Sequence, residues 1–259
     1  MPSQSGSRRL NFVILLLSLA MVTVGYGARA DDLTGTVSPF AGSGQSGYDG
    51  DSGPATDGEL HQPRMATFDG AGRMYIADTF NQVIRVVDTD GTMGTVAGVA
   101  KPVDGDDDSL CPRRFSGDGG PALEAKLACP HSLAVSPTGR LAIADSANHR
   151  IREVDSTGTI RTVAGTGGQG FKGDNGPAVN ATLSNPKGII YDAAGNLLIA
   201  DTNNNRIRKV DPDGIITTVV GNGVHGSAGD GGPALEAELW EPRTLALGPG
   251  GEIYFTEPR

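Results

Sequence analysis

The sequence has few of the residues that carry catalytic or metal chemistry. Its 259 residues include two cysteines, four histidines, one tryptophan and only 5% aromatic side chains. It contains no C-x-x-C pair, no G-x-S-x-G or H-E-x-x-H motif and no phosphate-binding loop. The histidines are His61, His131, His149 and His225, and they fall at four different positions of the repeat described below. A converging set of metal ligands is therefore not expected, and an enzyme is the less favoured interpretation.

Basic residues are also scarce, with 21 Lys and Arg against 30 Asp and Glu and a net charge of −9. This balance argues against a nucleic-acid partner, because neutralising phosphates requires clustered basic side chains. The one long apolar run, residues 12–24, follows Arg8 and Arg9 and precedes an Ala-x-Ala pattern that ends at Ala30. We interpret residues 1–30 as a signal peptide of a secreted or periplasmic protein and residues 31–259 as the mature domain.

An uncleaved membrane anchor is the alternative interpretation of that run. It is shorter than the roughly 20 residues that a spanning helix needs. We therefore expect no stable membrane insertion after cleavage.

A repeated pattern fills most of the remaining chain. Residues 199–221 contain the run I-A-D-T-N-N-N-R-I-R-K-V-D-P-D-G-I-I-T-T-V-V-G, and close copies end at Gly98 and Gly165. These final glycines and Gly221 are 67 and 56 residues apart, so the unit is 56 residues long and one connection carries 11 extra residues. Each unit has four short apolar runs separated by turn residues and no long helical pattern. The sequence thus predicts an all-β protein, a β-propeller with four-stranded blades.

The chain holds three complete units and parts of others. In the first unit the apolar runs span 65–68, 74–77, 83–87 and 95–98. The second run is apolar on both faces, which suits a strand lying between two neighbouring blades. Residues 38–42 fit a fourth strand, and residues 244–256 fit a first and a second strand. We expect three complete blades with partial ones at both ends, from the N-terminal portion of a longer protein. The alternatives are a four-bladed ring with an irregular last blade, or an arc completed by a second chain.

The I-A-D-x-x-N-x-R-I-R-x-V-D run, the T-V-A-G strand and the G-D-G-G-P-A loop resemble NHL repeats. The resemblance covers about residues 34–259 and is to the long-loop form of bacterial secreted proteins and teneurin-like NHL domains. It implies a β-propeller, of which six blades are usual, so the chain would be a fragment of a six-bladed ring. It also implies a secreted binding scaffold for a protein or surface glycan on the loop face. The alternative function is a hydrolase or lyase that acts on an anionic small molecule at the central channel.

Polar residues recur in the turn after each second strand, in the form Asp-Thr/Ser-x-Asn with an arginine four residues later. We predict that this set holds the blades together, with the arginines pairing with carboxylates. The set comprises Asp78, Asn81, Arg85, Asp145, Asn148, Arg152, Asp201, Asn204 and Arg208. The asparagines suit a left-handed turn conformation.

A second set of aspartates recurs in the Gly-rich loop before each first strand. We predict that these carboxylates cap local backbone amides, with calcium or ligand binding as the alternative. The members are Asp51, Asp118, Asp174 and Asp230. The loop prolines that follow are expected to be the first residues of short helices, whose leucines pack against the blade. These prolines are Pro54, Pro121, Pro177 and Pro233.

The insertion at residues 99–117 breaks the repeat and is the best candidate for a partner-specific contact. Its acidic cluster is Asp104, Asp106, Asp107 and Asp108. Asp104, Asp106 and Asp108 have a spacing that calcium favours, but the loop lacks the glycine and distal glutamate of an EF-hand, so a solvated loop is preferred and no cofactor is expected.

The two cysteines, Cys111 and Cys129, both belong to the exported part of the chain. We predict a disulfide between them that stabilises the fold by roughly 3 kcal/mol. Two separate thiols are the alternative.

The residue after the proline that opens each first strand is basic or histidine: Arg64, His131, Lys187 and Arg243. The first strand is the innermost strand of a propeller blade, so these side chains are expected at the mouth of the central channel. A basic ring there would attract an anionic ligand. The alternative is that they turn away and pair with nearby acids such as Glu59, Glu124 or Glu241.

Overall fold

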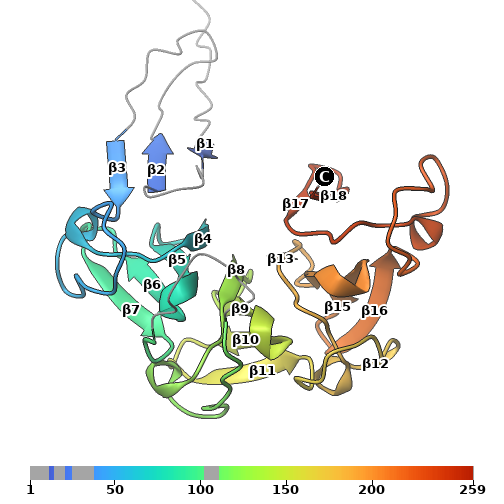
Figure 1. Ribbon diagram of the computed structural model, residues 1–259, viewed down its shortest axis with the longest axis horizontal. Helices are drawn as coiled ribbons and strands as arrows, with labels where there is room; N and C mark the ends of the chain where they lie inside the picture. Colours follow the sequence, from blue (N-terminus) through green and yellow to red (C-terminus); the bar gives the residue numbers. More distant parts are fainter. Residues whose placement is uncertain (1–11, 15–20, 25–37, 102–110, 259) are drawn as a thin grey trace, which may run out of the picture.

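The computed structural model describes residues 12–14, 21–24, 38–101 and 111–258. In these residues the regular elements are β-strands and single-turn 3₁₀ helices, labelled in Figure 1. The first blade is a four-stranded antiparallel sheet in sequence order. Its strands are β4 (Pro63–Phe68), β5 (Met74–Asp78), β6 (Val83–Val87) and β7 (Met93–Ala97).

The next blades repeat this antiparallel order. The second blade comprises β8 (Pro130–Val135), β9 (Leu141–Asp145), β10 (Arg150–Val154) and β11 (Ile160–Ala164). The third comprises β13 (Ile189–Tyr191), β14 (Leu197–Asp201), β15 (Arg206–Val210) and β16 (Ile215–Val220), with β12 (Gly176–Pro177) paired to β16. A two-stranded sheet follows, of β17 (Leu245–Leu247) and β18 (Ile253–Phe255). The prediction of four-stranded propeller blades is confirmed.

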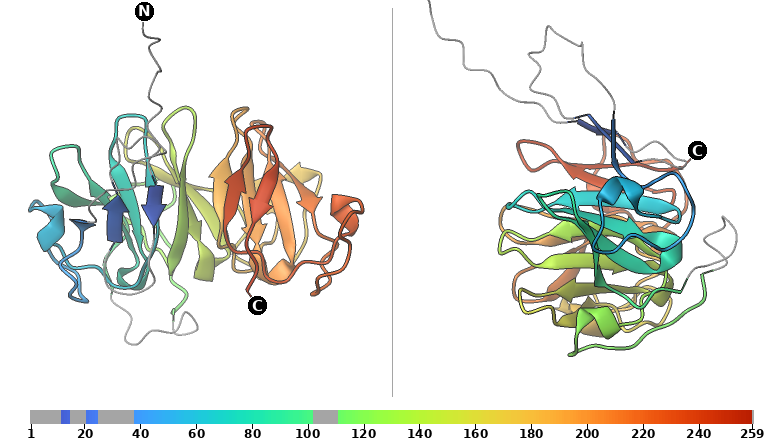
Figure 2. Two further views of the ribbon diagram at one scale, coloured as in Figure 1. Left: turned by 90° about the horizontal axis from the view of Figure 1, so that it is seen from above. Right: turned by 90° about the vertical axis from the view of Figure 1, so that its left-hand side faces the viewer.

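The blades follow one another along an arc, with β4, β8 and β13 on its inner side and β7, β11 and β16 on its outer side (Figure 1). Figure 2 shows the sheets stacked face against face along this arc. The second strands β5, β9 and β14 are buried at every position. Their apolar side chains pack against neighbouring blades, and burying one isoleucine stabilises the fold by roughly 1.5–3 kcal/mol.

A three-stranded sheet lies before the first blade. It contains β1 (Phe12–Ile14), β2 (Met21–Val24) and β3 (Ser38–Ala41), and β2 pairs with both of its neighbours. The strands β1 and β2 fall within the predicted signal peptide. Removal of residues 1–30 would take both strands away from the edge of β3, so the expected cleavage changes what covers this edge. The cleavage itself stays a prediction.

Each blade is entered through a loop that runs along the outer strand of the same blade. The amide of Gly119 donates to the carbonyl of Ile160 at 2.8 Å, and that of Asn175 donates to Ile216 at 2.7 Å. Such pairing covers the strand edges that would otherwise be open to aggregation. The leucines that end the loops, Leu60, Leu127, Leu183 and Leu239, are buried as predicted.

The loop prolines do not occupy the first helical position, so that prediction was wrong. Pro121 has a ψ of 130° and caps a single 3₁₀ turn, η4 (Ala122–Glu124). Because the backbone of Pro121 is extended, the helix begins at the next residue, the buried Ala122. The other turns of this kind are η1 (Ala55–Asp57), η6 (Ala178–Asn180) and η8 (Ala234–Glu236).

Candidate functional site

Three buried aspartates end the second strands, and each is held by the same partners. Asp145 accepts hydrogen bonds from the amide of Ala128 at 2.7 Å and from Asn148 Nδ2 at 2.9 Å, and Arg152 Nη1 lies 3.9 Å away. Asp78 has the matching partners His61, Asn81 and Arg85, and Asp201 has Ser184, Asn204 and Arg208. The bonds join the turn after the second strand to the loop that enters the blade, so both lie at one end of the propeller.

The asparagines in this turn are not the left-handed residues. The turns η2 (Thr79–Asn81), η5 (Ser146–Asn148) and η7 (Thr202–Asn204) are 3₁₀ turns, and the following residue has the positive φ. These residues are Gln82, His149 and Asn205. The asparagine side chain instead bonds the aspartate, as described above.

The loop aspartates bind side chains, not local backbone amides, which corrects the capping prediction. Asp118 accepts from Arg152 Nη2 at 2.6 Å and from Thr162 Oγ1 at 2.6 Å. Asp174 has the same arrangement with Arg208 and Thr218, and Asp51 with Arg85 and Thr95. The arginine of the third strand emerges beneath the loop, so a charge-assisted pair forms where local capping was expected. Asp230 is exposed.

Burial raises the pKa of Asp78 to about 7, and those of Asp145 and Asp201 to about 6. The asparagine, the backbone amide and the arginine beside each carboxyl act in the opposite direction. Perturbed carboxyl groups often mark a functional site. Here all three are fully buried and the same in the three complete blades, so we assign them to the internal framework of the blades.

The structure places two of the four residues expected at the channel mouth in one cavity. His131 and Lys187 line a shared cavity of about 210 Å³ together with Ser146 and Asn185. Arg64 lies over the ring of Phe80, 5.8 Å from its centroid. Arg243 is within 3.4 Å of Glu241, which is the pairing that the alternative interpretation named.

Cys111 and Cys129 form a disulfide with a Cα–Cα distance of 5.9 Å. It packs beside Phe80 and links the end of the insertion to the start of β8. The calcium candidates Asp104, Asp106 and Asp108, together with Asp107, lie outside the described residues. Within the described part of the chain, no group of three or more His, Cys, Asp or Glu side chains is arranged to hold a metal ion.

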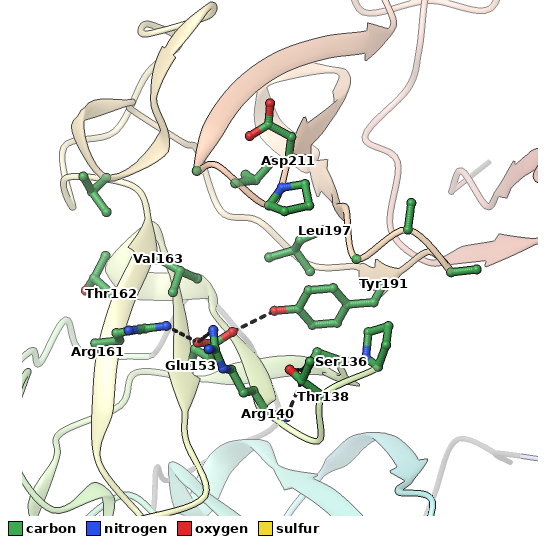
Figure 3. Close-up of a pocket in the computed structure, with 18 residues that line it drawn as sticks. Ser136, Thr138, Arg140, Glu153, Arg161, Thr162, Val163, Tyr191, Leu197 and Asp211 are labelled. Atoms are coloured by element: carbon green, nitrogen blue, oxygen red, sulfur yellow. Dashed lines mark hydrogen bonds and ion pairs between the residues drawn. The ribbon is translucent and has the colours of Figure 1, made fainter.

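An open groove of about 670 Å³ lies between the second and third blades (Figure 3). It is lined by the β8–β9, β13–β14 and β15–β16 turns and by part of β11, at the end of the strands opposite the Asp-x-x-Asn turns. At its base the buried carboxylate of Glu153 accepts from Arg161 Nη2 at 2.7 Å and from Arg140 Nη1 at 3.4 Å. Tyr191 Oη donates to the second carboxylate oxygen at 3.0 Å.

The two arginine side chains are about half exposed, at 48% for Arg140 and 54% for Arg161. Burial and the neighbouring Glu153 carboxylate raise the pKa of Tyr191, so its hydroxyl stays protonated and donates to that carboxylate. The cluster therefore presents two fixed guanidinium groups to the groove.

The sequence prediction missed this groove cluster, which comprises Arg140, Glu153, Arg161 and Tyr191. One blade earlier, the positions of Glu153, Arg161 and Tyr191 are occupied by Val86, Gly94 and Val135. A position-by-position comparison of the copies would have marked Glu153, because the variable residue in R-x-V-D is Val86, Glu153 and Lys209 in turn.

The repeat geometry agrees with the comparisons to known proteins. A family model described as the teneurin NHL domain matches residues 53–155 and 155–228, more than half of the chain. The chain belongs to this family. Membership supports a binding or scaffold role for the NHL chain, and the disulfide is consistent with export.

Mouse teneurin-4 is 30% identical to the NHL chain over 230 residues, covering 80% of the chain and 8% of teneurin-4. The chloroplastic protein SUPPRESSOR OF QUENCHING 1 of Arabidopsis thaliana is 30% identical over 182 residues, covering 69% of the chain and 16% of the relative. The NHL chain therefore spans a small part of the length of these relatives.

Two solved structures from Bacteroides thetaiotaomicron share the NHL chain's fold. A protein of unknown function has a TM-score of 0.59 at 16% identity, covering 92% of this chain and 54% of the other. An auxiliary nutrient binding protein has a TM-score of 0.56 at 15% identity, covering 92% and 53%. At these identities the likeness concerns the fold alone. Among the described residues of the NHL chain, no helix has the length and apolar character to cross a membrane.

Proposed function

We propose that this NHL chain is an exported scaffold that binds a protein or a surface glycan. The observation that supports this proposal is the difference between the polar residues inside the blades and those at the groove. The aspartates, asparagines and arginines common to the three blades bond to one another inside the blades. The exposed arginines of the groove cluster include Arg161, which no other copy has, and they face an open groove. The shared Asp, Asn and Arg residues thus build the framework, and Arg161, together with the exposed Arg140, is left for recognition.

Export is part of the proposal. The predicted signal peptide and the disulfide between Cys111 and Cys129 support it, because disulfides persist in oxidising compartments. Expression of the full chain with its first 30 residues, followed by N-terminal sequencing of the exported product, tests this part. Recovery of uncleaved protein in the reducing cytoplasm would contradict it.

The binding part is tested with purified full chain, native disulfide intact, on arrays of defined glycans and of defined extracellular peptides and protein domains. A scaffold gives saturable binding to members of one class, and heat-unfolded chain gives none. Absence of saturable binding in both arrays would overturn the scaffold assignment. The insertion at residues 99–117, partly outside the described residues, stays a proposed contact, and its replacement would weaken capture without unfolding the blades.

A second candidate function is favoured by one observation, the shared cavity of His131 and Lys187. The Lys187 side chain is largely buried, with 8% of the residue exposed. A buried ammonium beside an imidazole would bind an anionic small molecule, and a hydrolase or lyase could use the imidazole as a general base. Turnover of acidic sugars or lactones, lost in Lys187→Met and in His131→Asn, would support this candidate. No turnover with the full chain would remove it.

A further inference from the structure

We infer that the groove between the second and third blades binds a peptide segment of a protein partner. An acidic side chain of the peptide meets Arg140 and Arg161, and its apolar side chains lie along the groove walls. This inference rests on the proposed scaffold function and makes it specific, because it names the surface and the chemistry of the partner.

The charge of the groove cluster is the first step. Two guanidinium groups share one carboxylate, so the three ionised side chains carry one excess positive charge. Each guanidinium has five N–H donors, and one donor from each reaches Glu153. The remaining donors belong to half-exposed side chains at the groove surface. They suit a carboxylate, which accepts two parallel bonds from an arginine.

The second step is preorganisation. Glu153 is buried and takes a third hydrogen bond from Tyr191 across the blade interface. The carboxylate thus holds Arg161 at 2.7 Å before any ligand arrives. Ordering a long side chain on binding costs roughly 0.5–1.5 kcal/mol, and here part of that ordering is already present in the free protein.

Asp211 also lines the groove, and Asp155 lies outside the lining but interacts electrostatically with Arg161; both carboxylates are engaged by their own turns. Asp211 accepts from the amide of Ile215 at 2.8 Å, and Asp155 accepts from the amides of Thr157 and Thr159. Figure 3 places Asp211 at the far end of the groove from Arg140 and Glu153. Among the residues that line the groove, the two arginines therefore lie at one end and Asp211 at the other, and the acidic group of the ligand belongs at the arginines.

The walls between these ends favour a peptide over a sugar. They are formed by Val163, Val179, Leu197, Val210 and Pro212. Val179 is 48% exposed, although it is aliphatic. A sugar needs many convergent partners for its hydroxyl groups, and the hydroxyls that line the groove are already engaged: Tyr191 with Glu153, Thr162 with Asp118, and Ser136 with Thr138. Aliphatic walls with a few placed polar groups suit apolar side chains flanking a carboxylate.

The internal repeat of the chain supplies the control surface. At the same place between the first and second blades, Val86, Gly94 and Val135 stand where Glu153, Arg161 and Tyr191 stand here. Arg73 corresponds to Arg140 and lies over Tyr75, with Asp69 at 2.8 Å. The framework of the two blade pairs is the same, so a difference in binding is assigned to the exchanged side chains.

The test uses the full chain and fluorescein-labelled short peptides with a central glutamate between aliphatic residues. Fluorescence anisotropy is expected to show saturable binding that weakens as salt is raised. The same peptides with glutamine in the centre are expected to bind at least about tenfold more weakly, since a charge-assisted contact is lost.

The variants Arg161→Gly and Arg140→Gln are each expected to reduce affinity by about tenfold. Arg73→Gln is the matched control and is expected to leave affinity unchanged. The triple variant Glu153→Val, Arg161→Gly and Tyr191→Val copies the first interface and is expected to lose binding while its melting temperature stays within a few degrees of that of the wild type. Circular dichroism melting of every variant separates loss of binding from loss of fold.

Three outcomes overturn the inference. One is peptide binding that is equal in wild type and Arg161→Gly. Another is saturable binding of acidic oligosaccharides such as oligogalacturonate that is lost in Arg161→Gly, with no binding of the peptides. The third is binding of array proteins or glycans that is unaffected by all groove variants, in which case the scaffold function stands and only the groove assignment fails. Absence of any ligand on the arrays would instead remove the scaffold function itself.

Discussion

The first and second blade interfaces share one framework but differ in the side chains that cross them. At the first, Val86 and Val135 belong to one apolar cluster, and the disulfide of Cys111 and Cys129 lies at the opposite end of β8. At the second, Glu153 and Tyr191 form a hydrogen bond beside an open groove. The blades pack in both cases, so stacking does not depend on the groove cluster. Its polar side chains are therefore available for another role.

The largest effect on stability is expected from replacing the buried arginine that the first and second blades share. Replacing the buried Arg152 by methionine leaves Asp118 and Asp145 without their cation, and breaking a buried pair costs roughly 3–5 kcal/mol of unfolding free energy. Arg85→Met should cost a similar amount, because Arg85 has the same partners in the first blade. Urea unfolding measures both. A large inequality between the two variants would show that the blades are not equivalent frameworks.

This equivalence was visible in the sequence, but its bonding was not. The period, the apolar second strand and the recurrence of Asp145, Asn148 and Arg152 predicted the blades. The pairing of Asp118 with Arg152 was not predicted, because it joins residues 34 apart that meet only after the loop folds along its own blade. From the sequence alone, a carboxylate in a Gly-rich turn predicts capping of local backbone amides as readily as pairing with a distant arginine.

The groove cluster was hidden for a related reason. Arg140, Glu153 and Arg161 lie on three different segments of the second blade, and Tyr191 comes from the third. No spacing in the sequence joins them. The ring at the channel mouth stays a prediction: the four residues share one register, His131 and Lys187 line one cavity, and Arg243 pairs with Glu241.

The disulfide lies at the first interface, and it should give the largest difference in stability between the two interfaces. Changing both Cys111 and Cys129 to serine is expected to lower the unfolding free energy by about 3 kcal/mol, from the loop that the bond closes. Guanidinium unfolding under oxidising and reducing conditions measures this. The double variant should be insensitive to reductant. If the wild type is equally insensitive, the bond makes no such contribution.

The second interface has a pH-dependent contact in place of the disulfide. His149 Nδ1 accepts from the amide of Asn185 at 2.9 Å, and Asn205 Oδ1 accepts from the amide of Glu241 at 3.1 Å one blade later. Burial lowers the pKa of His149 from 6.5 to about 4. Below pH 6.5 the unfolded chain binds a proton that the folded chain does not, so stability falls as pH drops towards 4.

His149→Asn copies the residue of the next blade and cannot titrate. The variant should lose this part of the pH dependence, roughly 2–3 kcal/mol between pH 6.5 and 4, while keeping the hydrogen bond to Asn185. The measurement is the difference in melting temperature between wild type and variant at each pH across that range. The buried aspartates titrate in both proteins, so their contribution cancels in this difference. A constant difference with pH would contradict the role given to His149.

The smallest effect on stability is expected from exchanging the polar pair of the second interface for the valines of the first. In Glu153→Val with Tyr191→Val, both partners of a buried hydrogen bond are removed together, and Arg140 and Arg161 are exposed enough to return to water. Replacing such a group by packed apolar side chains is often neutral, so we expect a change within about 1 kcal/mol. Glu153→Val alone should cost more, because Tyr191 then keeps a hydroxyl at the interface without its acceptor. Thermal melting of the single and double variants decides the point. A double variant several kcal/mol less stable than wild type would mean that the polar pair holds these blades together, and the residues assigned to recognition would then belong to the framework.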